Sequence, residues 1–474
     1  MLDSGHTAWL LTASALVLLM TPGLAFFYGG LTRAKSTLNM MLMSFASIGV
    51  VSLLWVLVGF SISFGPTVHG LFGNLHFFGL NALGGDKIGN YASGVPDLVF
   101  VAFQLMFAII TVALISGAIA DRTRFGAWIV FSTIWAIIVY FPVAHWVFYA
   151  GTAAPVDKAG KILPGVHLGN GAASSAIAGS GGWIINRLGA LDFAGGTAVH
   201  INAGAAALAL CLVLGRRKGW PGTAMKPHNV PFVLLGSGLL WFGWFGFNAG
   251  SALQANGLAA QAFVNTQLAT AIGGLAWMAT ERLRDGHATN VGFASGAVAG
   301  LVAITPACGS VNSLGSVAVG AIAGVLCALA VGMKYRLGFD DSLDVVGVHL
   351  VGGLAGTLLV GLLATHHVDG VGVDGLLFGG GFKQLGIQAI AAISVGVYSF
   401  VVAFILGKLI DRFMGFRISE EDELTGIDLA VHAETAYELT GGFGSSLAAA
   451  GHGQQGHTSA VPAASLGTTT GAGV

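Results

Sequence analysis

The sequence predicts an all-α membrane protein with eleven transmembrane helices. Three features point to this class: an apolar composition, regularly spaced apolar stretches, and cations gathered in alternate connections. Of the 474 residues, 55% are hydrophobic and 9% are charged, and the mean hydropathy is +0.80. A soluble domain carries about 25% charged residues. The chain therefore belongs to the class of polytopic membrane proteins.

Apolar windows of about 20 residues, the length that crosses a bilayer as a helix, mark the individual spans. The eighth window is short, so its helix has to be tilted or buried. The eleven spans are predicted near residues 7–31, 40–64, 97–120, 126–150, 194–214, 230–250, 261–283, 290–304, 315–334, 345–364 and 386–411.

Lysine and arginine set the expected orientation. Most of them fall in alternate connections or just after the last span, from Arg33 and Lys35 onward, and the rule that cytoplasmic loops are positive places this set inside. The chain opens Met-Leu-Asp-Ser-Gly-His, without the cations of a signal peptide, so we expect the first helix to be retained. The prediction is a multi-pass membrane protein with its N-terminus outside and its C-terminus in the cytoplasm.

Eleven helices divide into five, five and one. An odd number in each repeat makes the second repeat run opposite to the first, as in many transporters. Two related stretches fit this division, Asp192 to His200 and Asp344 to His349, each an aspartate followed by Val-His and small residues. At ~1.5 Å per residue, His200 lies roughly 12 Å from Asp192 and His349 roughly 7 Å from Asp344, so both rings approach the midplane.

The chain organisation predicted around these helices has three parts. Residues 1–414 form the transmembrane domain, in which residues 151–191 are a long extracellular loop. Residues 415–439 form an acidic cytoplasmic tail. Residues 440–474 are Gly, Ala, Ser and His, a composition that buries no core and predicts disorder.

The two histidines are the first candidates for function, because ionisable groups inside a membrane are costly and face cavities or each other. The alternative is that each is a core histidine that hydrogen-bonds to a neighbouring serine or to a backbone carbonyl group. Two neutral imidazoles that share one N–H···N hydrogen bond suit a small neutral solute or a proton passed between rings. Zinc is the rival interpretation, but it needs a third ligand, and none lies at helical spacing from His200 or His349.

Asp192 and Asp344 each precede a helix, and each is placed to cap the free N–H groups of the next turn, for instance at Gly195, Gly196 or Gly347. A structural cap and an electrostatic role toward a cation are compatible, because a capped carboxylate near the mouth of a path still attracts cations.

Aromatic residues share helix faces with one another and with a serine. Phe103 and Phe107 are four residues apart, as are Phe247 and Ser251, and Phe148 follows Trp146. Aromatic rings in membrane helices commonly pack or lie at the interface. Rings beside a hydroxyl group near the outer end of a helix also form a cation-π site for a small ammonium ion, and rings one turn deeper close a pore.

Several long motifs occur in order along the chain from about residue 7 to Leu439. They are Asp192-Phe-Ala-Gly-Gly-Thr-Ala-Val-His200, Lys226-Pro-His-Asn-Val-Pro, Gly243-Trp-Phe-Gly-Phe-Asn-Ala-Gly-Ser251, Ala262-Phe-Val-Asn-Thr, Thr305-Pro-Ala-Cys-Gly and Asp344-Val-Val-Gly-Val-His349. In these motifs the chain resembles the ammonium transporter (Amt/Mep/Rh) family, on its bacterial Amt side. The resemblance implies two inverted five-helix repeats, a homotrimer and one substrate path through each protomer.

The resemblance also implies roles for residues of this chain. Phe103, Phe148 and Ser251 correspond to the extracellular ammonium site, with Asp192 as its supporting carboxylate. Phe107 and Phe247 correspond to a stacked gate, and His200 with His349 to the pore pair. The family usually has tryptophan at the position of Phe148, so a weaker cation-π face is expected here. The long loop before Asp192 is a second departure.

The implied mechanism is recruitment of ammonium or methylammonium outside, deprotonation near the phenylalanine gate, and passage of ammonia along the histidine pair, with or without a proton. Bare ammonium in an apolar pore pays heavily for desolvation, whereas ammonia does not. The alternatives are an ammonium sensor and an electroneutral gas channel of the Rh type.

Expected partners follow from composition and from the resemblance. The acidic tail from Gly415 to Leu439 is either simply solvated or a regulatory segment that contacts a neighbouring protomer and a PII-type signal protein (GlnK). Membrane lipids surround the helices. A net charge of −1 and the lack of a basic stripe argue against nucleic acid. The chain has no evident nucleophile, metal set or phosphate loop, so we expect neither an enzyme nor a cofactor.

Overall fold

The computed structural model describes residues 2–85, 87–89, 91–151, 181–368 and 372–437. The chain divides into two units, Met1–Ala436 and Tyr437–Val474, and every element below lies in the first. The predicted extracellular loop is therefore described only from residue 181 onward, and the predicted disordered tail, 440–474, lies outside the described residues.

Each of the first five predicted spans coincides with a helical segment, and several of these segments contain short π-helical or 3-10 turns. The long connection between the second and third spans holds the two-stranded antiparallel hairpin β1 (Thr67–Val68) and β2 (Phe72–Gly73), followed by η3 (Leu75–Leu80). The spans are α1 (Ser4–Leu31); η1 (Ala34–Ser36), α2 (Thr37–Leu54), η2 (Trp55–Gly59) and α3 (Phe60–Phe64); α4 (Asp97–Ile115) and η4 (Ser116–Ile119); α5 (Phe125–Trp135), η5 (Ala136–Tyr140) and α6 (Phe141–Phe148); and η7 (Gly196–Ile201) with α7 (Asn202–Leu214).

The remaining six predicted spans also coincide with helices. Two short helical turns, η6 (Trp183–Leu188) and η9 (Leu376–Phe378), lie in the connections before the fifth and the last span. The spans are α8 (Val230–Gly250), α9 (Gly257–Asp285), α10 (Asn290–Ile304), α11 (Ser313–Leu337), η8 (Val346–Leu350) with α12 (Val351–Leu363), and α13 (Lys383–Met414), and the chain continues into α14 (Glu420–Thr425) and α15 (Ile427–His432).

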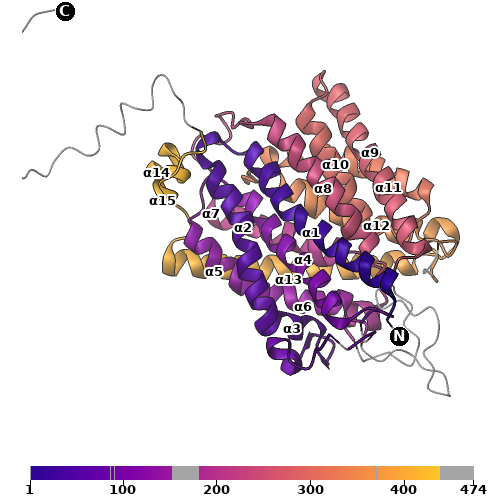
Figure 1. Ribbon diagram of the computed structural model, residues 1–474. Helices are drawn as coiled ribbons and strands as arrows, with labels where there is room; N and C mark the ends of the chain where they lie inside the picture. The colour runs from indigo at the N-terminus through magenta and orange to yellow at the C-terminus, as the bar shows by residue number, and fades with distance from the viewer. Residues whose placement is uncertain (1, 86, 90, 152–180, 369–371, 438–474) are drawn as a thin grey trace, which may run out of the picture. The chain divides into compact units, whose positions relative to one another are not determined.

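The helices lie side by side within this unit, and α1 packs along α8 (Figure 1). Among the described residues, nine spans are long and apolar enough to cross a membrane by themselves. The short α10 is buried, as predicted, between α9, α11 and α8. Glycine makes this burial possible: a Cβ on Gly300 would lie 2.3 Å from the Ala269 carbonyl oxygen.

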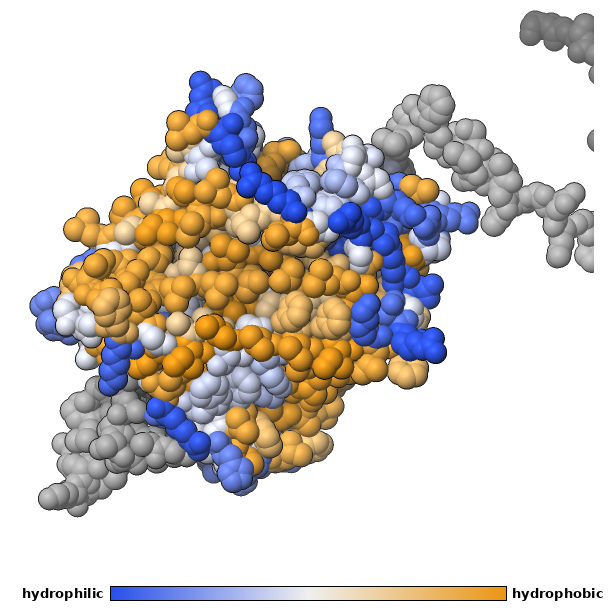
Figure 2. Space-filling view, turned by 180° about the vertical axis from the view of Figure 1, so that it is seen from behind, coloured by the Kyte–Doolittle hydropathy of each residue, from blue (hydrophilic) through white to orange (hydrophobic). Residues whose placement is uncertain are grey.

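The outer faces of the helices carry apolar side chains. Figure 2 shows apolar residues over most of one face of the molecule, with hydrophilic groups gathered toward its rims. On α13, for example, Ile393, Val397 and Phe413 are more than half exposed. A continuous apolar surface of this kind is costly in water and is matched by lipid hydrocarbon, so the composition argument for a membrane protein is supported by the placement of the residues.

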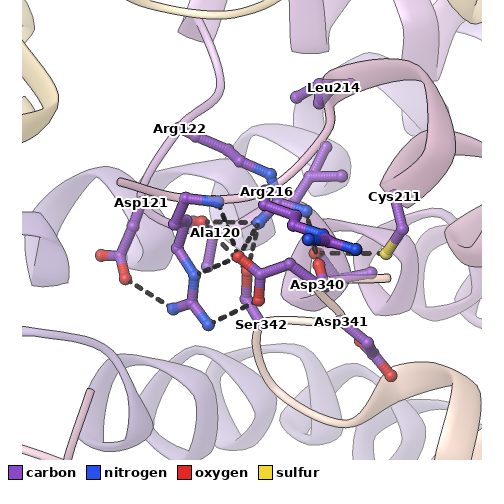
Figure 3. Close-up of polar contacts among 12 residues, drawn as sticks. Ala120, Asp121, Arg122, Cys211, Leu214, Arg216, Asp340, Asp341 and Ser342 are labelled. Carbon is purple, nitrogen blue, oxygen red and sulfur yellow. Dashed lines mark hydrogen bonds and ion pairs between the residues drawn. The ribbon is translucent and has the colours of Figure 1, made fainter. Parts of the chain in front are cut away.

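A buried network of ion pairs and hydrogen bonds connects the loops that follow η4 and α7 with the loop that precedes η8 (Figure 3). Arg217 follows α7 and binds Asp121 and Asp340 at 2.9 Å each. Arg122 donates to the carbonyl oxygen of Asp340 at 2.6 Å and to the hydroxyl group of Ser342 at 2.5 Å. The network fixes the loop that leads into η8, because charged groups this deeply buried are stable only when paired and hydrogen-bonded.

The acidic tail docks on its own chain. Glu423 is buried, accepts the backbone N–H of Lys218 at 2.6 Å and pairs with Arg417 at 2.7 Å. Asp428 accepts the N–H groups of Leu38 and Asn39 at the start of α2. The tail is thus a structured strap between α2 and the loop after α7, and not simply a solvated acidic segment.

Candidate functional site: an aromatic and histidine path

The path begins in a small cavity beside the N-terminal half of α4, with a volume of about 20 Å³. Phe103, Phe148 and Ser251, the three residues predicted to form a cation site, all line it. The hydroxyl group of Ser251 donates to the Phe247 carbonyl oxygen at 2.7 Å, so its lone pairs remain available as acceptors. The remaining lining residues are Phe100, Gln104, Phe107, Phe193 and Leu253.

Trp146 does not take the place of the tryptophan missing at position 148. Its indole N–H donates to the Leu71 carbonyl oxygen at 2.6 Å, and its ring lies against Trp183 and Tyr398. Phe148 alone presents its ring to the cavity from this helix, with its centroid 6.3 Å from that of Phe107.

Asp192 caps the helix that carries His200, as the sequence predicts. Its carboxylate accepts the N–H groups of Gly195, Gly196 and Thr197 at 2.8, 2.6 and 2.8 Å and also binds the Thr197 hydroxyl group. These donors use both oxygens and the residue is 5% exposed, so the carboxylate is placed to act on its surroundings through space and not by direct contact.

The cap also shapes the cavity. Gly195 has a φ of +117°, which favours glycine, and a Cβ on it would lie 3.3 Å from the Phe148 ring and 2.7 Å from Val199. The Asp192 carboxylate holds the N–H group of this glycine, so it positions the backbone directly beneath Phe148.

Phe107 and Phe247 close the path below the cavity. Their ring centroids are 4.2 Å apart at an interplanar angle of 31°, and they are 1% and 0% exposed. Phe107 also contacts Phe103, one turn outward, at 4.9 Å. The two rings therefore lie in contact with each other between the aromatic cavity and the histidine pair.

His200 and His349 lie directly below the rings. Their Nδ1 atoms are 3.2 Å apart, and their ring centroids are 5.3 Å apart. Both rings line a narrow cavity of about 10 Å³, whose other walls are apolar apart from the indole of Trp244. The Nε2 atom of His200 is buried and has no hydrogen-bond partner among the described residues, so it is free to meet a passing solute.

Sequence reasoning missed the role of Trp244. Its ring stacks on His200 with centroids 5.4 Å apart at 16°, and its N–H donates to the Thr305 hydroxyl group at 2.9 Å. Trp244 therefore fixes the His200 ring plane. Trp244 lies three residues before Phe247 and so shares its helix face, and this spacing could have indicated its role from the sequence.

The expected capping role of Asp344 is wrong, and Asp341 has that role instead. Asp341 accepts the N–H groups of Val345 and Val346 at 3.1 and 2.7 Å. Asp344 has a φ of +63° and pairs with Lys334. Asp341 lies eight positions before His349, as Asp192 lies eight before His200. The two repeats therefore align with Asp341 matched to Asp192 and His349 matched to His200.

The path widens at its other end. Along α1, Met20, Leu24 and Phe27 line the narrow histidine cavity, and Leu31, one turn further, lines a cavity of about 540 Å³. Asp344 and Lys334 lie in its wall. The phenylalanine pair thus lies between the small aromatic cavity and the histidine cavity, and the wide cavity lies beyond the histidine pair along α1.

A metal centre finds no support here. Within the described ranges, no group of three His, Cys, Asp or Glu side chains lies close enough together to hold a metal ion. The histidines have only each other at their Nδ1 atoms, and the Asp192 oxygens are engaged by N–H groups. The arrangement suits a small solute that exchanges hydrogen bonds and protons.

Comparison with known proteins identifies the family. The model of the Ammonium Transporter Family matches residues 8–437. An ammonium transporter of Mycobacterium tuberculosis is 57% identical in an alignment of length 465 that covers 94% of this chain and 92% of that protein. The chain belongs to the ammonium transporter family.

Two solved structures of this family share the fold. Candida albicans Mep2 has a TM-score of 0.77 at 35% identity and covers 89% of this chain and 88% of its own. A protein described as a sensor Amt protein has a TM-score of 0.76 at 28% identity and covers 90% of this chain and 98% of its own. The all-α, eleven-helix prediction is thereby confirmed for this ammonium transporter family member.

Proposed function

We propose that the chain transports ammonium across the cell membrane through the path described above. The observation that carries the proposal is the sequence of an aromatic cavity, a phenylalanine pair and a buried histidine pair in a member of the ammonium transporter family. Each part serves one step: recruitment, deprotonation and passage.

Recruitment takes place in the outer cavity. The rings of Phe103 and Phe148 offer cation-π faces to ammonium, and the Ser251 hydroxyl group accepts one of its N–H bonds. Asp192, which caps the helix that carries His200, adds negative electrostatic potential behind this cavity. Methylammonium fits the same chemistry, since it keeps three of the four N–H bonds.

Passage below the rings requires loss of the charge. The histidine cavity has a volume of only about 10 Å³ and its walls are largely apolar, so an ion there would lose its hydration without compensation. Ammonia crosses as a neutral molecule and exchanges hydrogen bonds with the His200 and His349 rings. Potassium has no proton to give up and is rejected.

Orientation, assembly and regulation complete the proposal. Arginine and lysine lie mainly at the end of the path that holds Arg217 and Lys334, so this end faces the cytoplasm and the N-terminus lies outside. The protein works as a homotrimer in the plasma membrane with lipid around it. The strap formed by α14 and α15 is the surface for a PII-type signal protein (GlnK) and for neighbouring protomers.

Uptake of radiolabelled methylammonium into liposomes tests the proposal. We expect saturable uptake that unlabelled ammonium inhibits and that potassium does not. A matched variant, Phe413→Ala, changes an exposed ring on the lipid face of α13 and serves as the control. Absence of uptake by correctly folded protein would contradict the proposal.

A sensor role is the second candidate, because one structural relative is described as a sensor Amt protein. In that case the aromatic cavity would bind ammonium and change the strap between α2 and the loop after α7, with no flux through the histidines. Binding without uptake in the same liposomes would favour the sensor.

A further inference from the structure

The cytoplasmic end of the path holds a lysine side chain in an unusual place. Lys334 lies near the end of α11 with its side chain 10% exposed, and its Nζ atom binds Asp344 Oδ1 at 2.5 Å and the Asp341 carbonyl oxygen at 2.9 Å. The same Nζ atom lies 5.6 Å from the centroid of the Tyr335 ring. A carboxylate, a carbonyl group and an aromatic face thus surround one primary ammonium group.

These groups lie in the wall of the wide cavity beyond the histidine pair. Asp344 is five residues before His349, and its side chain is 38% exposed. Lys334, Tyr335 and Asp344 all line both the cavity of about 540 Å³ and a neighbouring cavity of about 640 Å³. The lysine head group is therefore at the boundary between the two cavities and within reach of any solute that leaves or enters the path.

The wall beside this site is aromatic and fixed. Tyr335 stacks on Trp220 with ring centroids 5.6 Å apart at 9°, and the Arg216 guanidinium lies 5.2 Å from the Trp220 ring. The Tyr335 ring is held in place by this stack, so its face remains a partner for a cation even when the lysine moves away.

We propose that Asp344, the Asp341 carbonyl group and Tyr335 form a second ammonium-type cation site at the cytoplasmic end, and that Lys334 occupies it as a tethered competitor. The proposal rests on the proposed transport function. Lysine carries the same R–NH3+ group as methylammonium, so the pocket that holds it is built for a primary ammonium ion. Ammonium arriving from the cytoplasm has to displace the tethered group, whereas neutral ammonia leaving the pore passes without competing for the carboxylate.

The consequence is a difference in affinity between the two faces. A tethered group acts at an effective concentration in about the millimolar range or above, so it raises the cytoplasmic ammonium concentration needed to occupy the exit. It leaves the equilibrium across the membrane unchanged. Transport from outside thus continues while ammonium accumulates on the cytoplasmic side.

The test measures inhibition of inward ammonium current by luminal ammonium, in liposomes whose cytoplasmic face points inward. We expect Lys334→Met to be half-inhibited at a luminal concentration roughly tenfold lower than wild type. Lys334→Arg keeps a tethered cation and is expected to behave as wild type. The double variant Lys334→Met with Asp344→Asn lacks the carboxylate as well, so its half-inhibiting luminal concentration should not be lowered in this way.

Lys408→Met is the matched control, because Lys408 lies 5.8 Å from the Phe404 ring on the outer helix α13 and removing it deletes the same charge far from the exit. An unchanged half-inhibiting concentration in Lys334→Met would overturn the inference. Wild-type protein that carries no ammonium current at all would instead overturn the transport function, so the two failures are distinguishable.

A measurement on the wild-type protein covers the case in which Lys334→Met does not fold. Acetylation of Lys334 by an amine-reactive reagent from the cytoplasmic face is followed by mass spectrometry. We expect ammonium to displace the side chain and raise its acetylation rate in a saturable way, with sodium and the rate at Lys408 as references. A rate that ammonium leaves unchanged would contradict the tethered competitor.

Discussion

The Nδ1 atoms of His200 and His349 lie 3.2 Å apart, on two helices whose first N–H groups are each capped by an aspartate eight residues before the histidine. One N–H···N hydrogen bond fits this distance, so one ring donates and the other accepts. The Nε2 atom of His200 is buried and has no hydrogen-bond partner among the described residues. The pair joins the two halves of the chain at the narrowest point.

Replacing His200 with alanine removes that hydrogen bond and opens the cavity to water. We expect the ammonium current to fall by roughly tenfold, which corresponds to about 1.4 kcal/mol, the order of one lost hydrogen bond. Selectivity against potassium should fall as well, because water in the cavity hydrates ions. Ion-replacement currents of His200→Ala check this, and full selectivity in the variant would contradict the account.

Phe148→Trp should strengthen recruitment, because tryptophan has the stronger cation-π face. At about 0.5–1 kcal/mol for a partly exposed site, the half-saturating ammonium concentration should fall about two- to fivefold. The control is Trp146→Phe. Trp146 lies outside the cavity, against Tyr398, so this substitution should leave the half-saturating concentration unchanged. Equal shifts in both variants would show that the cavity does not select through its rings.

Asp192→Asn should cost both stability and transport. An amide side chain has one acceptor oxygen and its NH2 group opposes the helix N–H groups, whereas the carboxylate accepts five donors. We expect a loss of about 3 kcal/mol, seen as a lower Tm, and a smaller loss of about 1 kcal/mol for Thr197→Val. A variant Asp192→Asn with wild-type Tm and uptake would disprove the capping role.

The loop before η8 should give the protein a pH-dependent stability. Burial, and next the nearby charge of Asp344, raise the pKa of Asp341 to about 6. The folded protein therefore holds this proton more tightly than the unfolded chain does, and the resulting stabilisation is full below about pH 4 and is lost as the pH rises through about 6. Asp341→Asn should remove this part of the dependence of Tm on pH between 4.5 and 7. Parallel curves for the two proteins would contradict the assignment.

The helices and most of the candidate path follow from the sequence. Apolar length predicts the spans, and the spacing of Phe103 with Phe107 and of Phe247 with Ser251 places each pair on one helix face. In the structure Phe103 and Phe107 line the same cavity, and the Ser251 hydroxyl group donates to the Phe247 carbonyl oxygen. The aspartate that caps the second repeat was misassigned because Asp344 and Asp341 both precede the helix, and only the backbone shows which one turns toward its N–H groups.

Other features depend on contacts between distant segments, so they could not be predicted from the sequence. Trp244 stacks on His200, and Lys334 reaches Asp344 across a loop. Neither pair has a diagnostic spacing. The docking of Asp428 onto the start of α2 is likewise a contact over 389 positions, from Asn39.

Solid-supported-membrane electrophysiology on the purified protein in liposomes tests the central claim most directly. Ammonium pulses are compared with equal pulses of sodium and potassium, for wild type and for His349→Ala. We predict a saturable transient current selective for ammonium that the histidine variant alters. Uptake of methylammonium without charge movement would instead indicate an electroneutral gas channel, and binding with neither current nor uptake would contradict transport through the histidine pair.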